Sequence, residues 1–263
     1  GWSARENARK ANLMRRLARH ISSRLLPIVA ACVINALPAS AQDIARASFG
    51  DPTTRYDHGV LGDAVEWGSL TLGLADGTSR RIILPQVLVF EDTSPRIADL
   101  DGNGPPEVIV VESHQSKGAR LAVYGASGRI AQTPFIGRKN RWLAPIGAAD
   151  FTGNGRLEIA IVVTPHLSGS VQLLAYDNSG LAVIATAEGF TNHRIGDPEI
   201  AGGIRTCGPH PELILAQMPW QRSAPSQMVA LQLDGKTLSP RNFDVPFTAS
   251  NTAAAQACTL DPN

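Results

Sequence analysis

The sequence predicts an all-β fold, β-propeller-like, with about four blades of four-stranded antiparallel sheets. Three observations support this prediction. A unit of about 51 residues repeats along the chain, which is typical of solenoids, propellers and arrays. The apolar runs inside each unit are short and are bounded by Gly, Pro, Asn or Ser, as in strands joined by hairpins. The 263 residues include 24 Gly and 18 Pro, a turn-rich composition that favours many short strands.

The first 41 residues differ from the rest in charge and order. They hold seven basic residues and one acid. A basic stretch, 14–24, leads into an apolar stretch, 25–37, and then into Ala39-Ser40-Ala41, which is the order of a secretory signal peptide. We expect residues 1–41 to comprise an upstream extension and a signal peptide, Met14 to Ala41, that is cleaved before Gln42.

Two alternatives remain for this segment. The first is a buried amphipathic helix in place of a leader. The second is a lipoprotein leader in which Cys32 of Val29-Ala30-Ala31-Cys32 is the lipidation site. Because the apolar run continues beyond Cys32, we prefer cleavage near Ala41. The run is short and contains Pro27 and Asn35, so we expect no membrane span.

Removal of the leader changes the charge of the protein. The whole chain has a formal net charge of +1, with 24 basic and 23 acidic residues. Residues 42–263 keep 17 basic and 22 acidic residues, which argues against nucleic-acid binding. We expect a single, monomeric, periplasmic or secreted bacterial domain over 42–263, with an unknown protein, glycan or small molecule as its partner.

The repeat is clearest between residues 99–111 and 150–162, at an offset of 51. Asp, Gly, Asn, Gly, Glu and a final Val coincide in these two segments. A degraded third copy begins near 194, and a less similar unit precedes the first. We predict blades over 55–90, 91–140, 141–192 and 193–245, or five blades if the tail 246–263 adds a closing strand. A β-solenoid is the alternative, although its coils are usually shorter and more regular.

The loop at 99–107 has the ligand spacing of a cation site. Asp99, Asp101 and Asn103 occupy its positions 1, 3 and 5, Gly104 permits a sharp turn, and Glu107 stands at position 9. Calcium binds six to eight oxygen ligands, many of them from alternate side chains of a turning loop. An EF-hand is excluded because its twelfth position would be Val110 rather than Glu. The alternative is an Asx turn with solvated acids.

This nine-residue loop between strands resembles the calcium loop of integrin-type FG-GAP and bacterial VCBS repeats, which fold as β-propeller blades. The resemblance covers about 95–245 and implies a structural Ca²⁺. The implied ligands of the first loop are Asp99, Asp101, Asn103, Glu107 and the carbonyl of Pro105. Those of the second loop are Asp150, Thr152, Asn154, Glu158 and the carbonyl of Arg156. Since Thr152 replaces a carboxylate, we expect weaker or no binding there, and we expect no ion in the third copy.

Two cysteines remain after the leader, Cys207 and Cys258. In an exported chain they are most simply one disulfide. The alternative is a pair of buried free thiols.

No sequence motif identifies an enzyme: HExxH, GxSxG, CxxC and a phosphate-binding loop are all missing. One hypothesis places His58, Arg96, Trp142 and Arg194 at a polar channel mouth that holds an anionic ligand; ordinary loop packing is the alternative. The leading function is an exported, non-catalytic, calcium-stabilised binding or scaffold propeller. A propeller-type hydrolase or lyase and a surface adhesion module are the alternatives.

Overall fold

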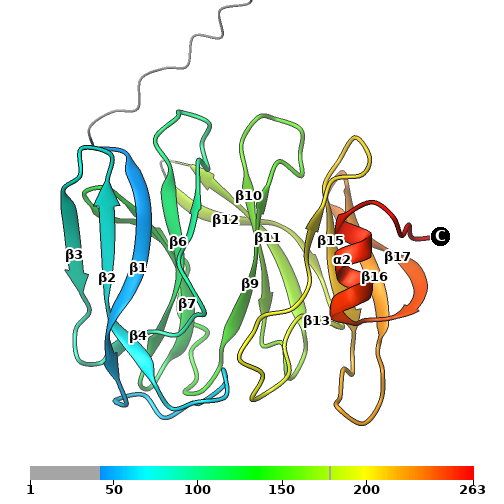
Figure 1. Ribbon diagram of the computed structural model, residues 1–263, viewed down its shortest axis with the longest axis horizontal. Coiled ribbons are helices and arrows are strands. Elements are labelled where there is room, and N and C mark those ends of the chain that lie inside the picture. Colours follow the sequence, from blue (N-terminus) through cyan, green and yellow to red (C-terminus); the bar gives the residue numbers. More distant parts are fainter. Residues whose placement is uncertain (1–41, 178) are drawn as a thin grey trace, which may run out of the picture. The chain divides into compact units, whose positions relative to one another are not determined.

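A computed structural model describes residues 42–177 and 179–263 (Figure 1). The predicted signal peptide and Cys32 lie outside these residues. The regular secondary structure of the described part consists of antiparallel strands and one α-helix near its end. The elements are β1 (Ile44–Thr53), β2 (Glu66–Leu74), β3 (Ser79–Ile83), β4 (Leu88–Phe90), β5 (Arg96–Ala98), β6 (Glu107–His114), β7 (Gly118–Gly125), β8 (Gly128–Gln132), β9 (Leu143–Ala149), β10 (Glu158–Val163), β11 (Ser170–Asp177), β12 (Gly180–Ala187), β13 (Phe190–Thr191), β14 (Gly203–Arg205), β15 (Glu212–Gln217), β16 (Gln227–Asp234), β17 (Thr237–Pro246) and α2 (Ala249–Gln256).

The strands form three antiparallel sheets, which follow one another in chain order (Figure 1). The first has the order β1-β2-β4-β6-β7-β8, with β3 beside β2 and β5 beside β6. The second is β12-β11-β10-β9, and the third is β13-β15-β16-β17 with β14 beside β15. The all-β class is therefore confirmed. In the described residues, no closure of the sheets into a ring is seen.

The first sheet joins what the sequence predicts as two blades. Strand β4 is the link, because Phe90 pairs with Trp67 of β2 on one side and with Glu112 of β6 on the other. The structure also adds β1 to the first unit, where the predicted blade began only at residue 55. The described part of the chain thus has three sheets where four separate blades were expected.

The tail forms a helix and not a closing strand. Helix α2 is capped by Thr248, whose hydroxyl accepts a hydrogen bond from the backbone N–H of Asn251 at 3.2 Å. The helix buries Thr252 and Ala255 against the third sheet. The disulfide Cys207–Cys258 joins the residue just beyond the helix to the third sheet unit, with Cα atoms 5.6 Å apart. The predicted pairing of these cysteines is confirmed.

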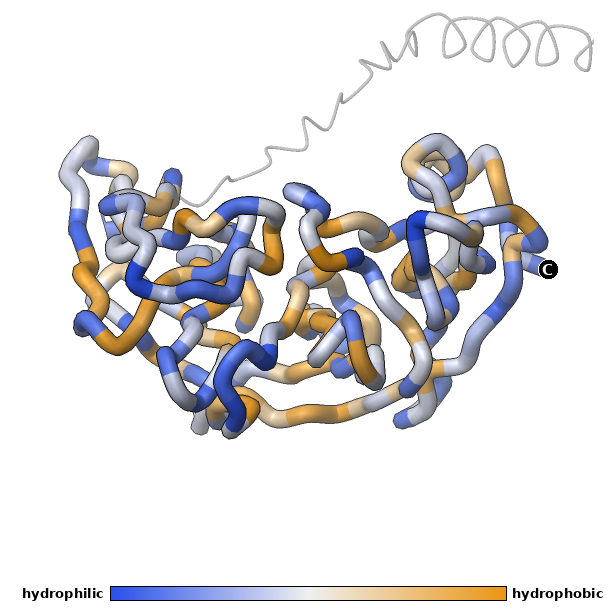
Figure 2. The backbone as a smooth tube through the Cα atoms, turned by 90° about the horizontal axis from the view of Figure 1, so that it is seen from below, coloured by the Kyte–Doolittle hydropathy of each residue, from blue (hydrophilic) through white to orange (hydrophobic). Residues whose placement is uncertain are grey.

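The core lies between neighbouring sheets. In β10, Ile159 and Ile161 pack toward the first sheet, while Ala160 and Val162 pack toward the third. Side chains alternate between the two faces of a strand, so a strand covered on both faces needs an apolar residue at every position. This explains the continuous apolar runs of the repeat. Figure 2, in which the backbone is coloured by hydropathy, shows apolar stretches alternating with hydrophilic ones along the chain.

No helix in the described part of the chain has the length and apolar character needed to cross a lipid bilayer.

Candidate functional site

Each sheet contains the same structural unit, a strand paired with the next long strand of the chain, which begins at a buried glutamate. The three glutamates are Glu107 of β6, Glu158 of β10 and Glu212 of β15, all at most 6% exposed. They pair in register with Ala98, Ala149 and Arg205 respectively. A buried carboxylate needs a compensating partner. The chemistry of the three sites therefore depends on what each glutamate contacts.

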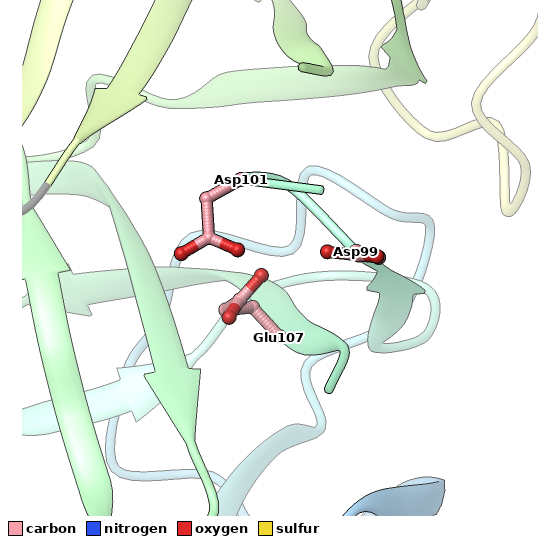
Figure 3. A group of neighbouring side chains, drawn as sticks. All are labelled: Asp99, Asp101 and Glu107. Atoms are coloured by element: carbon pink, nitrogen blue, oxygen red, sulfur yellow. The ribbon is translucent and has the colours of Figure 1, made fainter. Parts of the chain in front are cut away.

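In the first loop the glutamate faces other acids. Ligand oxygens of Asp99, Asp101 and Glu107 lie within 4.8 Å of one another. Figure 3 shows the carboxyl groups of Asp101 and Glu107 turned toward each other, with Asp99 beside them. Burial raises the pKa of Glu107, and the negative charges of Asp101 and Asp99 raise it further. This acidic triad can hold a metal ion.

Backbone N–H groups shape the same loop. The Asp99 carboxylate accepts hydrogen bonds from the N–H of Asn103 at 3.1 Å and of Gly104 at 2.9 Å. Glu107 accepts one from the N–H of Leu100 at 2.9 Å. The side-chain amide of Asn103 donates to Asp101 at 2.8 Å. Pro105 is exposed and follows directly. Among the described residues, no side chain donates a hydrogen bond to Glu107, so the repulsion between Glu107 and Asp101 is offset only by backbone N–H groups and by the Asn103 amide on Asp101.

In the second loop a hydroxyl replaces the carboxylate. Thr152 Oγ1 donates a hydrogen bond to Glu158 at 2.9 Å, and the N–H groups of Phe151 and Thr152 donate to the other oxygen at 2.9 and 3.2 Å. Asp150 accepts two backbone N–H bonds, as Asp99 does. Glu158 is thus satisfied by protein donors.

The remaining predicted ligands of the second loop are partly engaged within it. The side-chain oxygen of Asn154 accepts the N–H of Arg156 at 2.8 Å, which holds the turn closed. The carbonyl of Arg156 remains as a candidate ligand. The second loop therefore has the same backbone hydrogen bonds to its first aspartate as the first loop, but it has one carboxylate fewer.

In the third unit a guanidinium group neutralises the glutamate. Arg205, which is 3% exposed, places Nε 3.2 Å from Glu212, and Arg241 approaches the other oxygen at 3.1 Å. Arg205 occupies the register position of Ala98 and Ala149. The equivalent glutamates therefore have three different partners: other acids, a hydroxyl and an arginine.

A second candidate site is a cavity of about 720 Å³. Its walls come from the beginning of β2, the segment between β4 and β5, strand β9, and the loop 198–202 that precedes β14. The polar groups that line it are Asp63, Glu66, Asp92, Thr93, Ser94, Arg96 and Glu199. Arg96 forms an ion pair with Asp92 at 2.7 Å. Sequence reasoning singled out Arg96 but missed Glu66 and Asp92.

Glu66 and the two adjacent acids Glu91 and Asp92 are almost fully buried, at 2%, 0% and 1% exposure. Burial raises the pKa of Glu66 to about 9, and the charges of Glu91, Asp63 and Asp92 contribute. Burial also raises the pKa of Glu91 and of Asp92, although His58 and Arg96 act against it. No sequence motif marks these acids, because they come from separate strands.

Three of the four residues of the channel-mouth hypothesis contact the adjacent acids Glu91 and Asp92, and the fourth, Arg194, lies elsewhere. His58 Nδ1 is 2.6 Å from Glu91 Oε1, and the buried Trp142 donates its indole N–H to the Glu91 carbonyl at 2.9 Å. These two residues therefore both contact Glu91, and Arg96 contacts the next residue of the chain, Asp92. Arg194 lines other cavities, pairs with Asp197 at 2.7 Å and stacks over Trp220.

Two histidines, the partly buried His166 and the buried His193, form a hydrogen-bonded chain beside Trp142. His166 Nε2 lies 2.8 Å from His193 Nδ1, and His193 Nε2 lies 2.9 Å from the carbonyl of Asp197. The carbonyl can only accept, so His193 carries its proton on Nε2 and His166 donates to the other nitrogen. Burial lowers the pKa of His166 to about 4, with the neighbouring His193 contributing, and it lowers that of His193 as well. Both rings are neutral at pH 7.

Comparison with known proteins gives only distant likenesses. No family model and no curated protein matches the chain. Among solved structures it is similar to the rhamnogalacturonan lyase YesW, with 14% identity, a TM-score of 0.41, and coverage of 74% of this chain and 49% of that one. For the exotype rhamnogalacturonan lyase YesX, the identity is 11% and the TM-score is 0.39, and the match covers 75% of this chain and 55% of that one.

A Bacillus licheniformis rhamnogalacturonan lyase, PL11, gives 15% identity, a TM-score of 0.40, and coverage of 79% of this chain and 50% of that one. The chain thus spans about half the length of the lyases it resembles. At these values the likeness is to the arrangement of sheets and carries no argument about activity.

Proposed function

We propose that this chain is an exported, non-catalytic binding or scaffold domain of β-propeller-like construction, in which the loop 99–107 holds one structural calcium ion. The observation that supports this proposal is the contrast between equivalent glutamates. Glu158 has the Thr152 hydroxyl and Glu212 has the Arg205 guanidinium. Glu107 has only backbone donors and two further acids. A divalent cation supplies the missing positive charge.

Calcium is the ion that fits the donors best. All candidate ligands are oxygens: the three carboxylates, the Asn103 side chain and the Pro105 carbonyl. Hard cations prefer such ligands, and calcium tolerates an irregular loop geometry better than magnesium does. The second loop offers fewer charges, and Glu158 is already satisfied. We propose weaker or no binding there.

Export is supported by the disulfide Cys207–Cys258, because such bonds persist in oxidising compartments. We propose a periplasmic or secreted location and a monomeric state, with a protein, glycan or small molecule as the partner.

Binding is favoured over a hydrolase or lyase activity. The enzymatic alternative has one specific observation behind it, the buried Glu66 at the 720 Å³ cavity. General acid–base catalysis by carboxyls normally needs two with separate roles. Asp92, the other buried carboxyl that lines the cavity, is held by Arg96 and by the N–H of Thr93, so it is already engaged and does not pair with Glu66 in an acid–base role. Nothing specific favours the adhesion module.

Thermal unfolding with and without calcium tests the proposal. We expect millimolar calcium to raise the melting temperature of the wild-type domain by roughly 5–10 °C relative to a chelator. Asp101→Thr gives the first loop the residue that the second loop has at the same position, Thr152. This variant should therefore fold, and calcium should no longer raise its melting temperature. Thr152→Asp should lower the melting temperature of the calcium-free domain and should add a second calcium site, so that calcium raises the melting temperature further than in wild type.

Asp57→Thr is the matched control, because Asp57 is an exposed acid outside both loops and should leave the calcium response unchanged. A wild-type melting temperature that is the same in calcium and in chelator, or a full response in Asp101→Thr, would contradict the proposal.

A further inference from the structure

The cavity between β2, β5, β9 and the loop 198–202 has the size of a ligand site. Its volume of about 720 Å³ falls in the range of small-molecule pockets, roughly 300–1,000 Å³. It combines apolar walls, among them Trp67 and Ile146, with a few polar groups. Concave sites of this composition commonly bind ligands.

One buried polar side chain in this cavity lacks a partner among the described residues. Glu66 is 2% exposed and lines the cavity. Among the described residues, its carboxyl group forms no hydrogen bond and no ion pair, whereas the neighbouring Glu91 contacts His58 and Ser113 and Asp92 contacts Arg96. Leaving a carboxyl group buried without a partner costs free energy. A ligand that supplies a donor at this point would remove that cost.

The charge of the walls indicates which ligand fits. Four acids line the cavity, Asp63, Glu66, Asp92 and Glu199, and Arg96 is the single basic residue among the lining residues described. Arg96 is already paired with Asp92. No three of these acids bring carboxylate oxygens within 4.8 Å of one another in the described residues, in contrast to the loop 99–107. The arrangement therefore suits a larger cation better than a single metal ion.

We propose that this cavity binds an organic cation, through an ammonium or guanidinium group that pairs with Glu66 and contacts the ring of Trp67. The proposal deepens the proposed binding function by naming the class of ligand. Charge-assisted hydrogen bonds to a carboxylate are about twice as strong as neutral ones, and an aromatic ring adds a favourable contact to a cation.

Binding should release a proton from Glu66. The charged groups that act on this carboxyl are Glu91, Asp63 and Asp92, which disfavour its ionised form, and Tyr56 lies within electrostatic range of it. Arg96 and Glu199 line the same cavity, and His58 binds Glu91. The pKa of Glu66 is about 9 in the free protein, so the group is protonated at pH 7. A bound cation stabilises the carboxylate instead. We expect about one proton released per ligand bound at pH 7, and almost none above pH 10.

Titration calorimetry of the calcium-loaded domain tests this inference, with agmatine as a small guanidinium and ammonium probe and N-acetyl-tetralysine amide as a peptide probe. Two buffers of different ionisation enthalpy give the number of protons released. Agmatine alone binding indicates a free small-molecule ligand, and both probes binding indicates a site open to basic side chains; either result supports the inference. Glu66→Gln should weaken binding about tenfold or more.

Glu188→Gln is the matched control, since it makes the same chemical change at an exposed residue outside the cavity. Failure of both probes to bind at about 10 mM, unchanged affinity in Glu66→Gln, or complete displacement of the probe by extra calcium would each overturn the inference. Because the calcium response of the melting temperature is measured separately, the inference can fail while the proposed function stands.

Discussion

The substitution Glu66→Gln should stabilise the domain at neutral pH. Glutamine has nearly the same shape as glutamic acid and cannot ionise. The carboxyl of Glu66 has a pKa of about 9 in the folded chain against 4.5 ordinarily, so the folded state binds a proton that the unfolded state releases between these values. The contribution of Glu66 to stability is therefore fully present below about pH 4.5 and is lost as the pH rises toward 9.

The expected size follows from about 1.4 kcal/mol per unit of pKa. The gain in unfolding free energy of Glu66→Gln over wild type should be under 1 kcal/mol at pH 5, about 3 kcal/mol at pH 7 and about 5 kcal/mol at pH 8.5. These are upper values, because the glutamine must also be accommodated in the site.

Urea denaturation of the two proteins at these three pH values, in constant calcium, measures the gain. The difference between the proteins is the test, since other groups shape the wild-type curve. Glu188→Gln, the same chemical change at an exposed residue outside the cavity, is measured alongside as the control. A Glu66→Gln gain that does not grow with pH would refute the assignment of a buried, protonated Glu66.

Three further predictions concern the other buried groups. His166 has a pKa lowered to about 4 from 6.5, so its contribution to stability falls as the pH drops through this window. Between pH 7 and pH 4.5, the unfolding free energy of His166→Gln should therefore fall by about 2–3 kcal/mol less than that of wild type, as measured by urea denaturation. Arg205→Ala places the residue of the other two units opposite Glu212 and leaves that glutamate without its buried partner; we expect a loss of about 3–5 kcal/mol, and a loss under 1 kcal/mol in calorimetry would contradict this reasoning. Replacing both Cys207 and Cys258 by Ser removes a covalent link across 51 residues and should cost roughly 3–4 kcal/mol, with the helix α2 losing its amide protection first.

Glu66 and His166 act in opposite directions between pH 4.5 and 7. Acidification favours the folded state through Glu66, by about 3 kcal/mol, and disfavours it through His166, by about 2–3 kcal/mol. These two contributions to the unfolding free energy should therefore largely offset each other in the wild type, while other groups shape the rest of its curve. Measured as differences from wild type, the two single variants should slope in opposite senses with pH.

The sequence predicts the repeated loops well because their structure is local. Asp99 and Asp150 each hold the N–H groups four and five residues ahead, and glycines at 102, 104, 153 and 155 adopt positive φ values. Both features follow from a short stretch of residues. The replacement of Asp101 by Thr152 in the second copy also predicts a loss of charge. The hydrogen bond from Thr152 to Glu158 could not be predicted from the sequence.

Other parts could not be read from the sequence, for two physical reasons. Strand β1 and helix α2 bury few side chains, so neither has a strong hydrophobic period. The cavity depends on contacts between distant segments, because Glu66 begins one strand, Asp92 follows another, and the loop 198–202 belongs to a third sheet unit. Only the pairing of β4 with both β2 and β6 brings the first two together.

The two repeated loops are also joined to each other. The N–H of Leu157 in the second loop donates to the carbonyl of Leu100 in the first at 3.0 Å, and Leu100 is the residue whose own N–H binds Glu107. Opening either loop therefore exposes amides of both, as one cooperative unit in hydrogen exchange. An ion bound by Asp99, Asp101 and Glu107 should slow exchange at Leu157, fifty residues beyond the last of its ligands, and so transmit rigidity from the first sheet to the second.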